Sequence, residues 1–218
     1  MAGFWDVNSI TAENLNKVGP LFDGVVGTNG QYQDLYAAMV SPSGPQWKRV
    51  LLIPGATLSQ ALTLSSSHNS GCIVNVGPKY LPISTAYAWT IQADDFRIEG
   101  IDIRNSAGVA LTVTGARMQA TRCTFNYSSS HGLFLSGGSS HYLWSCMAYG
   151  NGGDGFRIAA GLAVVTVIGC HSQGNTGYGL RDLAASGSQL IAVGNTVWGN
   201  TAGQITTTST LLAANKTS

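Results

Sequence analysis

The ten residues from Tyr149 to Ile158 read YGNGGDGFRI, and versions of this pattern recur along the chain. The repeated glycines lie 24, 23, 24 and 24 residues apart, at Gly108, Gly132, Gly155, Gly179 and Gly203. Two further columns keep a similar step, namely Asn105, Asn126, Asn151, Asn175 and Asn200, and Ile101, Cys123, Cys146, Cys170 and Asn195. A fixed period of about 20–50 residues is typical of a solenoid. The sequence therefore predicts a repeat that extends from about Asp94 to Ser209.

Short segments inside each repeat alternate apolar and polar residues, which indicates strands with one buried face. Each coil is expected to hold about three short strands that pair with their equivalents about 4.8 Å away in the next coil. The predicted inward columns are Phe96, Met118, His141, Val165 and Leu190; Ile98, Ala120, Leu143, Val167 and Ala192; Ile103, Phe125, Ala148, Ser172 and Val197; and Val109, Leu133, Phe156 and Leu180, followed two residues later by Leu111, Leu135 and Ile158.

The segments before the regular repeat predict a cap and irregular first coils. Apolar residues at Tyr32, Leu35, Tyr36 and Met39 follow helical spacing, which favours a short capping helix near 31–40. We therefore expect an all-β fold with an N-terminal arm over 1–24, a β-helix over 25–209 and a C-terminal tail over 210–218. Strands of the first coils are expected at 50–53, 61–64, 72–76 and 88–92.

The composition narrows the classes of partner. Charged residues make up only 10% of the chain and the net charge is +1, with no basic run, so nucleic acid is not an expected partner. No stretch of 18 apolar residues predicts a membrane span. The N-terminus lacks the basic and apolar segments of a secretion signal, so we expect synthesis in a host cytoplasm.

The cysteine and asparagine columns are interpreted as structural. Cys123, Cys146 and Cys170 recur one coil apart, whereas metal ligands must converge on one point. We expect buried free thiols that pack as small apolar groups, and no metal or cofactor. The asparagines are expected to form a turn ladder, because their amides can bond to the coils above and below.

An outward column contains the candidate contact residues. It reads Ala110, Phe134, Arg157, Arg181 and Ile205, and its two arginines repel each other unless an anion lies beside them. Asp154 and Asp182 are the nearby carboxylates, and Asp182 falls where the register favours an apolar residue, which predicts a bulge. The cluster of Phe134, Asp154, Arg157, Arg181 and Asp182 is either an Arg/Asp surface network or subunit interface, or a site for an acidic sugar, since arginine forks suit carboxylates.

A catalytic pair is harder to find. Glycoside hydrolysis needs two carboxylates across one bond. Asp102 is expected to face outward, but none of its predicted stacked neighbours is an acid: Thr124, Met147, His171 and Thr196. The four histidines form no evident ligand set. We therefore name no catalytic residue and favour a protein that is not an enzyme.

The helix TNGQYQDLYAAM, the following KRVLLIPG and the coils of the type YGNGGDGFRI together resemble the pectin-lyase-like superfamily. The resemblance covers roughly residues 27–209. It implies a single-stranded right-handed parallel β-helix of about seven coils of 22–25 residues. The superfamily includes pectate lyases, polygalacturonases, pectin methylesterases, epimerases and many phage tailspikes and other virion proteins.

Two functions remain open. The first is a non-catalytic structural protein of a phage or virus particle, as a capsid decoration or cement protein or as a tail component, located in the virion. The resemblance implies a homotrimer, and Phe4 and Trp5 in the arm would dock on the protein's own domain or on other virion proteins. The alternative is a polysaccharide-active enzyme of the lyase, hydrolase or esterase type, or a glycan-binding module, that uses the outer face around Arg157 and Arg181.

Overall fold

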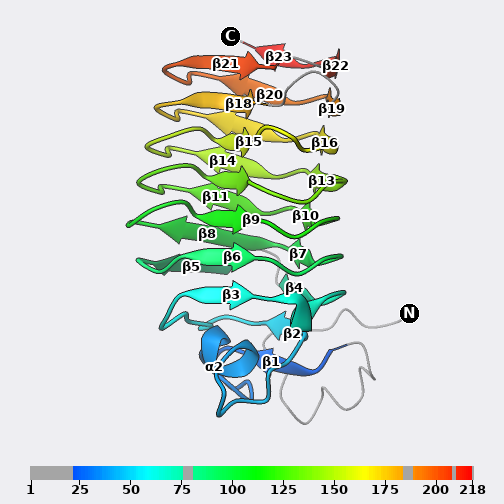
Figure 1. Ribbon diagram of the computed structural model, residues 1–218. Coiled ribbons are helices and arrows are strands. Elements are labelled where there is room, and N and C mark those ends of the chain that lie inside the picture. Colours follow the sequence, from blue (N-terminus) through cyan, green and yellow to red (C-terminus); the bar gives the residue numbers. More distant parts are fainter. Residues whose placement is uncertain (1–21, 76–80, 184–188, 208–209, 218) are drawn as a thin grey trace, which may run out of the picture.

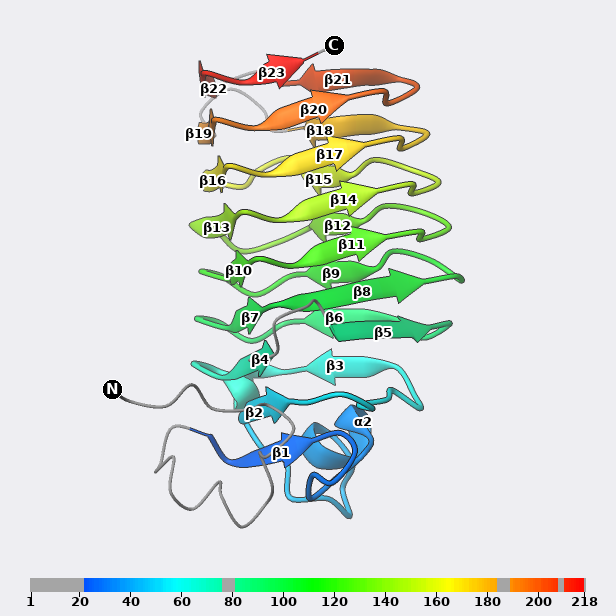
Figure 2. The same ribbon diagram turned by 180° about the vertical axis from the view of Figure 1, so that it is seen from behind.

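Three parallel sheets run along one axis and give the molecule the form of a stack of coils (Figure 1). The computed structural model describes residues 22–75, 81–183, 189–207 and 210–217. Within one coil the chain passes through sheet 1, then sheet 2, then sheet 3, and every strand pairs in parallel with its equivalents in the adjacent coils. Figure 2 shows sheet 2 from the front. The prediction of an all-β parallel β-helix is confirmed.

The strands are short and evenly spaced. Sheet 1 consists of β1 (Gly24–Val26), β2 (Arg49–Leu52), β4 (Cys72–Asn75), β7 (Arg97–Glu99), β10 (Gln119–Thr121), β13 (His141–Trp144), β16 (Val164–Ile168), β19 (Gln189–Val193) and β22 (Thr210–Ala213). Sheet 2 consists of β5 (Leu81–Thr85), β8 (Ile101–Asn105), β11 (Thr124–Asn126), β14 (Met147–Tyr149), β17 (His171–Gln173), β20 (Thr196–Trp198) and β23 (Lys216–Thr217). Sheet 3 consists of β3 (Leu62–Leu64), β6 (Trp89–Ile91), β9 (Leu111–Val113), β12 (Leu133–Leu135), β15 (Phe156–Ile158), β18 (Tyr178–Asp182) and β21 (Gly203–Thr206).

The predicted register is confirmed in sheets 1 and 2 and corrected in sheet 3. Leu111, and not Val109, pairs with Leu133. Gly108 and Gly203 are therefore outside the glycine column, because Ala110 lies beside Gly132 and Gly203 pairs with Tyr178. For the same reason the outward column of sheet 3 is Thr112, Phe134, Arg157, Arg181 and Thr206, without the predicted Ala110 and Ile205.

The corner between sheets 1 and 2 is a column of residues in the left-handed backbone conformation. Their φ values lie between 49° and 71°, at Gly100, Arg122, Ser145, Gly169, Gly194 and Ala214. The backbone N–H of each of the first five donates to the carbonyl of the residue just before its equivalent in the following coil, as Ser145 donates to Ile168. Repeating the same dihedral angles in each coil keeps the corners stacked, so the strands on either side stay in register.

The asparagine ladder lies at the turn from sheet 2 to sheet 3. The Oδ1 of Asn175 accepts from the backbone N–H and the Nδ2 of Asn151, at 3.0 and 2.8 Å. In the same way, the Oδ1 of Asn200 accepts from the backbone N–H and the Nδ2 of Asn175, at 3.1 and 2.8 Å. One predicted member is wrong, because Ser128 and not Asn126 occupies the ladder and donates its N–H to Asn151. Asn126 ends the preceding strand and donates instead to Asp102.

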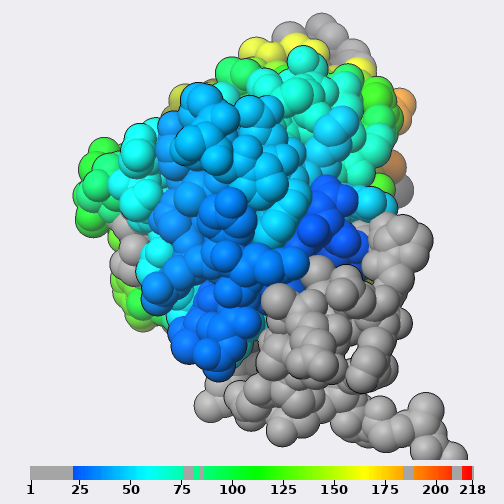
Figure 3. Space-filling model, turned by 90° about the horizontal axis from the view of Figure 1, so that it is seen from below, coloured from blue at the N-terminus to red at the C-terminus, as the bar shows by residue number. Residues whose placement is uncertain are grey.

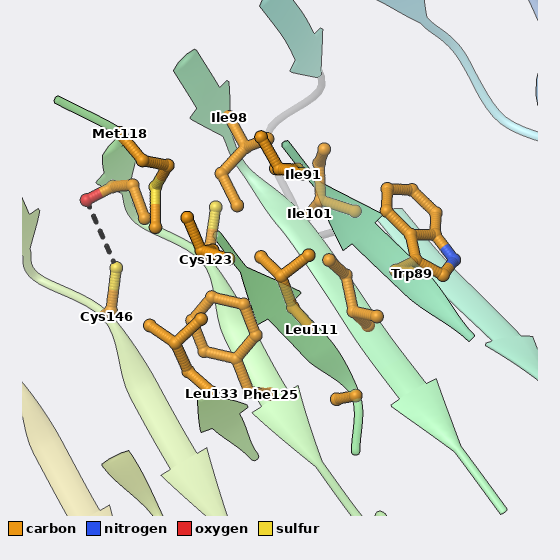
Figure 4. Packing of buried hydrophobic residues seen from close by; sticks show 14 of the residues in the cluster. Trp89, Ile91, Ile98, Ile101, Leu111, Met118, Cys123, Phe125, Leu133 and Cys146 are labelled. Atoms are coloured by element: carbon orange, nitrogen blue, oxygen red, sulfur yellow. Dashed lines mark hydrogen bonds between the residues drawn. The ribbon is translucent and has the colours of Figure 1, made fainter. Parts of the chain in front are cut away.

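The core between the sheets is a continuous stack of buried apolar side chains (Figure 4). Cys123, Cys146 and Cys170 are buried free thiols, as predicted. Burial raises the pKa of the Cys146 thiol, which bonds weakly to the carbonyl oxygen of Ala120 at 3.4 Å. Cys146 therefore behaves as a packing group, whereas its hydrogen bond to Cys170 lowers the pKa of the Cys170 thiol.

The bulge predicted at Asp182 does not form. Asp182 pairs in register with Ile158 at an inward position and is only 3% exposed. Its Oδ2 accepts a hydrogen bond from the Thr207 hydroxyl at 2.9 Å. This hydrogen bond satisfies the buried carboxylate, so β18 keeps its register at Asp182 without a bulge.

The first coil is closed by helix α2 (Leu35–Met39), which is shorter than the predicted segment near 31–40. It begins late because Asp34 is its N-cap and accepts the Ala37 N–H at 2.9 Å. Leu35 and Met39 are fully buried against the first coils. Figure 3 views this end of the molecule, where the blue surface belongs to the first described residues of the chain.

Both predicted ends of the β-helix need correction. Strand β1 already begins at Gly24, inside the predicted arm. At the other end, β22 and β23 pair with β19 and β20, so the predicted separate tail over 210–218 is instead a further coil. Phe4 and Trp5 lie outside the described residues.

Replacement of Asn175 by alanine should lower the free energy of unfolding by about 2–4 kcal/mol, because several buried polar groups lose their partner. Those groups include the N–H of Asn151 and the carbonyl of Ala148. Asn215→Ala is the matched control, since Asn215 makes equivalent bonds to Asn195 from a partly exposed position and should cost less. Urea denaturation of both variants measures the difference; equal losses would contradict a buried ladder.

Candidate functional site

Side chains from three successive coils converge on the outer face of sheet 3. The strand register stacks Phe134, Arg157 and Arg181 one above another. The residue before each aligned glycine adds a second column beside them. Together these two columns form the arginine cluster, which consists of His131, Phe134, Asp154, Arg157, Tyr178 and Arg181.

A buried carboxylate lies at the centre of the arginine cluster. Asp154 is 2% exposed, and its Oδ1 accepts the backbone N–H of Tyr178 at 2.8 Å. Its Oδ2 lies 3.4 Å from the Nη1 of Arg157 and 3.8 Å from the Nη1 of Arg181. One carboxylate therefore serves two guanidinium groups, which leaves a formal surplus of one positive charge.

His131 limits the number of hydrogen-bond acceptors available to Arg157 and to the backbone of Asp154. Its Nδ1 lies 2.8 Å from the backbone N of Asp154, and its Nε2 lies 2.9 Å from the Nη1 of Arg157. Burial, and then the charge of Arg157, lower the pKa of His131, which favours the neutral ring. A neutral imidazole accepts only one hydrogen bond. One of these two donors therefore lacks an acceptor on His131, and the buried Nε of Arg157 has no partner in the described part of the chain.

Aromatic rings hold both guanidinium groups in place. The Cζ of Arg157 lies 5.5 Å from the centre of the Phe134 ring, and the Cζ of Arg181 lies 5.2 Å from that of Tyr178. Both distances suit a cation–π interaction. The side chains of Arg157 and Arg181 stay 27% and 35% exposed. The cluster therefore presents two fixed guanidinium groups to solvent, an arrangement suited to binding an anion.

Four of the five predicted contact residues come together here: Phe134, Asp154, Arg157 and Arg181. Asp182 does not join them, because its side chain points into the coil. The prediction missed His131 and Tyr178. Both precede an aligned glycine, as Asp154 does, so the column of residues before the glycines was the available signal.

The acidic residues around sheet 3 are spread over different turns and strands. Asp182 is the only acidic residue in the strands of sheet 3, and its side chain is turned into the coil. Asp154 lies in the turn before β15, and Asp94 and Asp95 lie in the turn after β6, where both pair with Arg117. Asp102 lies on sheet 2, where its carboxylate pairs with Arg104 at 2.6 Å. Within the described ranges, no group of three or more histidine, cysteine or acidic residues could hold a metal ion. The same ranges contain no helix with the length and apolar character to cross a membrane.

The fold has a clear family match. Residues 61–217 match the family model described as the right-handed beta helix region. This chain belongs to that family. No curated protein matches the chain.

Solved structures of similar fold come from pectin-active enzymes. The pectate lyase Pel9A superposes with a TM-score of 0.60 and 20% identity over 81% of this chain and 54% of the lyase. A pectin methylesterase mutant in complex with a hexasaccharide superposes with a TM-score of 0.52 and 15% identity, over 86% of this chain and 67% of the enzyme. The pectin methylesterase of Aspergillus niger superposes with a TM-score of 0.51 and 12% identity, over 89% of this chain and 85% of the enzyme. The chain thus spans about half the length of the lyase. These low identities show a shared pectin-lyase-like fold only.

The stability of the protein should fall as the pH drops below about 6.5. Burial lowers the pKa of His131 and of the inward-facing His141 in the folded state. The unfolded chain therefore takes up protons first as the pH falls through its ordinary histidine pKa. For each histidine, the free energy of unfolding can fall by up to about 1.4 kcal/mol per pH unit, until the pH reaches the pKa of that histidine in the folded state.

Urea denaturation at about pH 7.5 and pH 5.5 measures this loss. His141→Leu and His131→Gln should each show a smaller drop between the two pH values than the unmodified protein. An unchanged drop in both variants would contradict the assignment.

Proposed function

We propose that this protein is a non-catalytic structural protein of a phage or virus particle, either a capsid decoration protein or a tail component. The placement of Asp154 and Asp182 carries the proposal. Asp154 is shared by two arginines, and Asp182 is turned into the coil. The described strands of sheet 3 therefore offer no pair of outward carboxylates across one substrate bond, which glycoside hydrolysis requires.

The lateral surface suits contacts between subunits. Charged residues are only 10% of the chain, so its faces are built largely from uncharged side chains. Large rings such as Trp144 and Trp198 are 51% and 40% exposed. Aromatic residues of this kind are enriched in interfaces. We propose a homotrimer that packs side by side, contacts other virion proteins and resides in the virion.

Light scattering should give three times the mass of one chain, and the protein should not depolymerise polygalacturonate or other acidic polysaccharides. The decisive variant is Asp154→Asn. A monomer that cleaves such a polysaccharide, and loses this activity when Asp154 becomes asparagine, would overturn the proposal.

The second candidate function is binding of an acidic glycan by the arginine cluster. It is favoured by the part-exposed guanidinium groups of Arg157 and Arg181 and by the surplus positive charge over Asp154. The carboxylate of a uronate residue fits a guanidinium fork. By their names, the structural neighbours act on pectin, which supports a uronate as the first ligand to try.

Arg181→Ala should weaken binding of oligogalacturonate at least about tenfold, because a charge-assisted hydrogen bond contributes about 1.5–3 kcal/mol. Asp154→Asn should tighten binding, since it adds one net positive charge. Arg117→Ala is the matched control, because Arg117 pairs with Asp95 at the corner that leads into sheet 1. Calorimetry at low and high salt measures the affinities, and equal affinities for Arg181→Ala and Arg117→Ala would exclude the cluster.

A further inference from the structure

The outer face of sheet 1 changes character part-way along the stack. Strands β13, β16 and β19 lie one above another here (Figure 1). The strand register aligns two outward columns across these three strands, whose inward residues are buried. We call this surface the apolar face and define it by the five apolar residues of the two columns: Tyr142, Trp144, Ile168, Ile191 and Val193.

The sequences of β16 and β19 are apolar on both sides of the sheet. They read VVTVI and QLIAV, which are near-continuous apolar runs. Such runs are typical of parallel strands that are covered on both faces, whereas a strand with one solvated face alternates apolar and polar residues. The core of the coil covers one side, where Val165 and Val167 are buried. On the other side Ile168, Ile191 and Val193 stay partly exposed in the described chain.

The part of the same sheet nearer the N-terminus carries charges that are already paired. Glu99 forms ion pairs with Arg97 and with Arg122, the latter at 2.6 Å. By contrast, β13, β16 and β19 contain no aspartate, glutamate, lysine or arginine. An apolar area beside a polar, ion-paired one is the division found between the core and the rim of a protein interface.

The chemistry of the apolar face selects its partner. A charged group laid against it would lose water without gaining a counter-charge, which is costly. An uncharged apolar surface would instead release water from both sides. Every copy of this chain carries such a surface, so the apolar face is complementary to itself.

The size of the sheet decides how two copies lie. The outward residues Val25 and Leu51 of β1 and β2 are already covered and pack with Phe22, which leaves the face from β4 to β22. Six steps of about 4.8 Å and a strand length of about 17 Å give this face an area of about 490 Å². An antiparallel pair that overlaps only from β13 to β22 would cover about 240 Å². Parallel coil axes therefore double the contact and bring it closer to the roughly 800 Å² per partner of a stable interface.

We propose that the apolar face is covered by the same face of neighbouring copies of this chain, with their coil axes parallel. The inference rests on the homotrimer proposed above and names the face through which its copies meet, so that sheet 1 of each copy is turned to the three-fold axis. Trp144, Ile168 and Val193 then lie at the same height as their equivalents in the neighbouring copies. The arginine cluster, on sheet 3, stays outside this contact.

A lysine on the apolar face should separate the copies. Trp144→Lys and Ile168→Lys should each raise the chain concentration at which half of the oligomer dissociates at least tenfold, because the contact would bury an unpaired charge. Light scattering over a dilution series measures this concentration. Trp198→Lys is the matched control, because Trp198 also ends a strand and is 40% exposed, against 51% for Trp144, but belongs to sheet 2. It should keep the mass of three chains.

A mixture of opposite charges tests the parallel arrangement. Trp144→Lys and Trp144→Glu should each dissociate when alone, and an equimolar mixture of the two should form oligomers again, because the new charges lie near each other at one height. Recovery of the oligomer also shows that both variants are folded. A mixture that stays dissociated, although circular dichroism shows the strand content of the unmodified protein, would overturn the arrangement.

The apolar face and the trimer can fail separately. A trimer that persists in both lysine variants, or that only Trp198→Lys dissociates, overturns the apolar face as the contact and leaves the trimer intact. A dimer that Trp144→Lys dissociates supports the apolar face and overturns the trimer alone. An unmodified protein that stays monomeric up to about 1 mM overturns both. The depolymerisation assay then decides by itself whether the protein is non-catalytic.

Discussion

The backbone hydrogen bonds between successive coils constrain every other feature of this protein. Each strand lies between its equivalents, so the neighbours of any residue are the residues one repeat away, as Cys146 lies between Cys123 and Cys170. A coil that changes length must absorb the change at a turn. The left-handed corners, with φ near 50–70°, and the asparagine ladder keep those turns stacked. Packing of the core follows from that register.

The same constraint separates structure from function. Inward positions are fixed by the stack, and even Asp182 and His141 are accommodated there by local hydrogen bonds. Outward positions are free to vary between coils, and on two outer faces the side chains have unusual chemistry. The arginine cluster concentrates positive charge around Asp154, whereas the outer face of sheet 2 pairs its Asp102 with Arg104 and carries exposed rings such as Tyr127 and Trp198. A rigid stack holds both surfaces without further support.

Much of the fold was predictable from the sequence, because apolar alternation and the repeat both depend on local spacing. The inward columns of sheets 1 and 2 were correct to the residue. The errors arose where a residue was assigned to a column because it was of the same type as the column's other members, although it lies at a different position in the coil. Gly108 resembles the column glycines but lies off them, and Asn126 precedes a left-handed residue that moves the ladder to Ser128. Strand β5 was missed because of Pro82, which an edge strand of the sheet tolerates. His131 was missed because its role depends on Asp154 and Arg157 in the next coil.

The most direct test of this account is the hydrogen exchange of the asparagine side-chain amides, followed by NMR. In the folded protein the Nδ2 hydrogens of Asn175 bond to the Oδ1 of Asn200 and to the hydroxyl of Ser172. They should exchange as slowly as the backbone amides of the central strands, since both require the stack to open. The exposed Asn69 provides the fast reference. Exchange of Asn175 at the rate of Asn69 would show that the ladder is not part of the stack and would contradict the account.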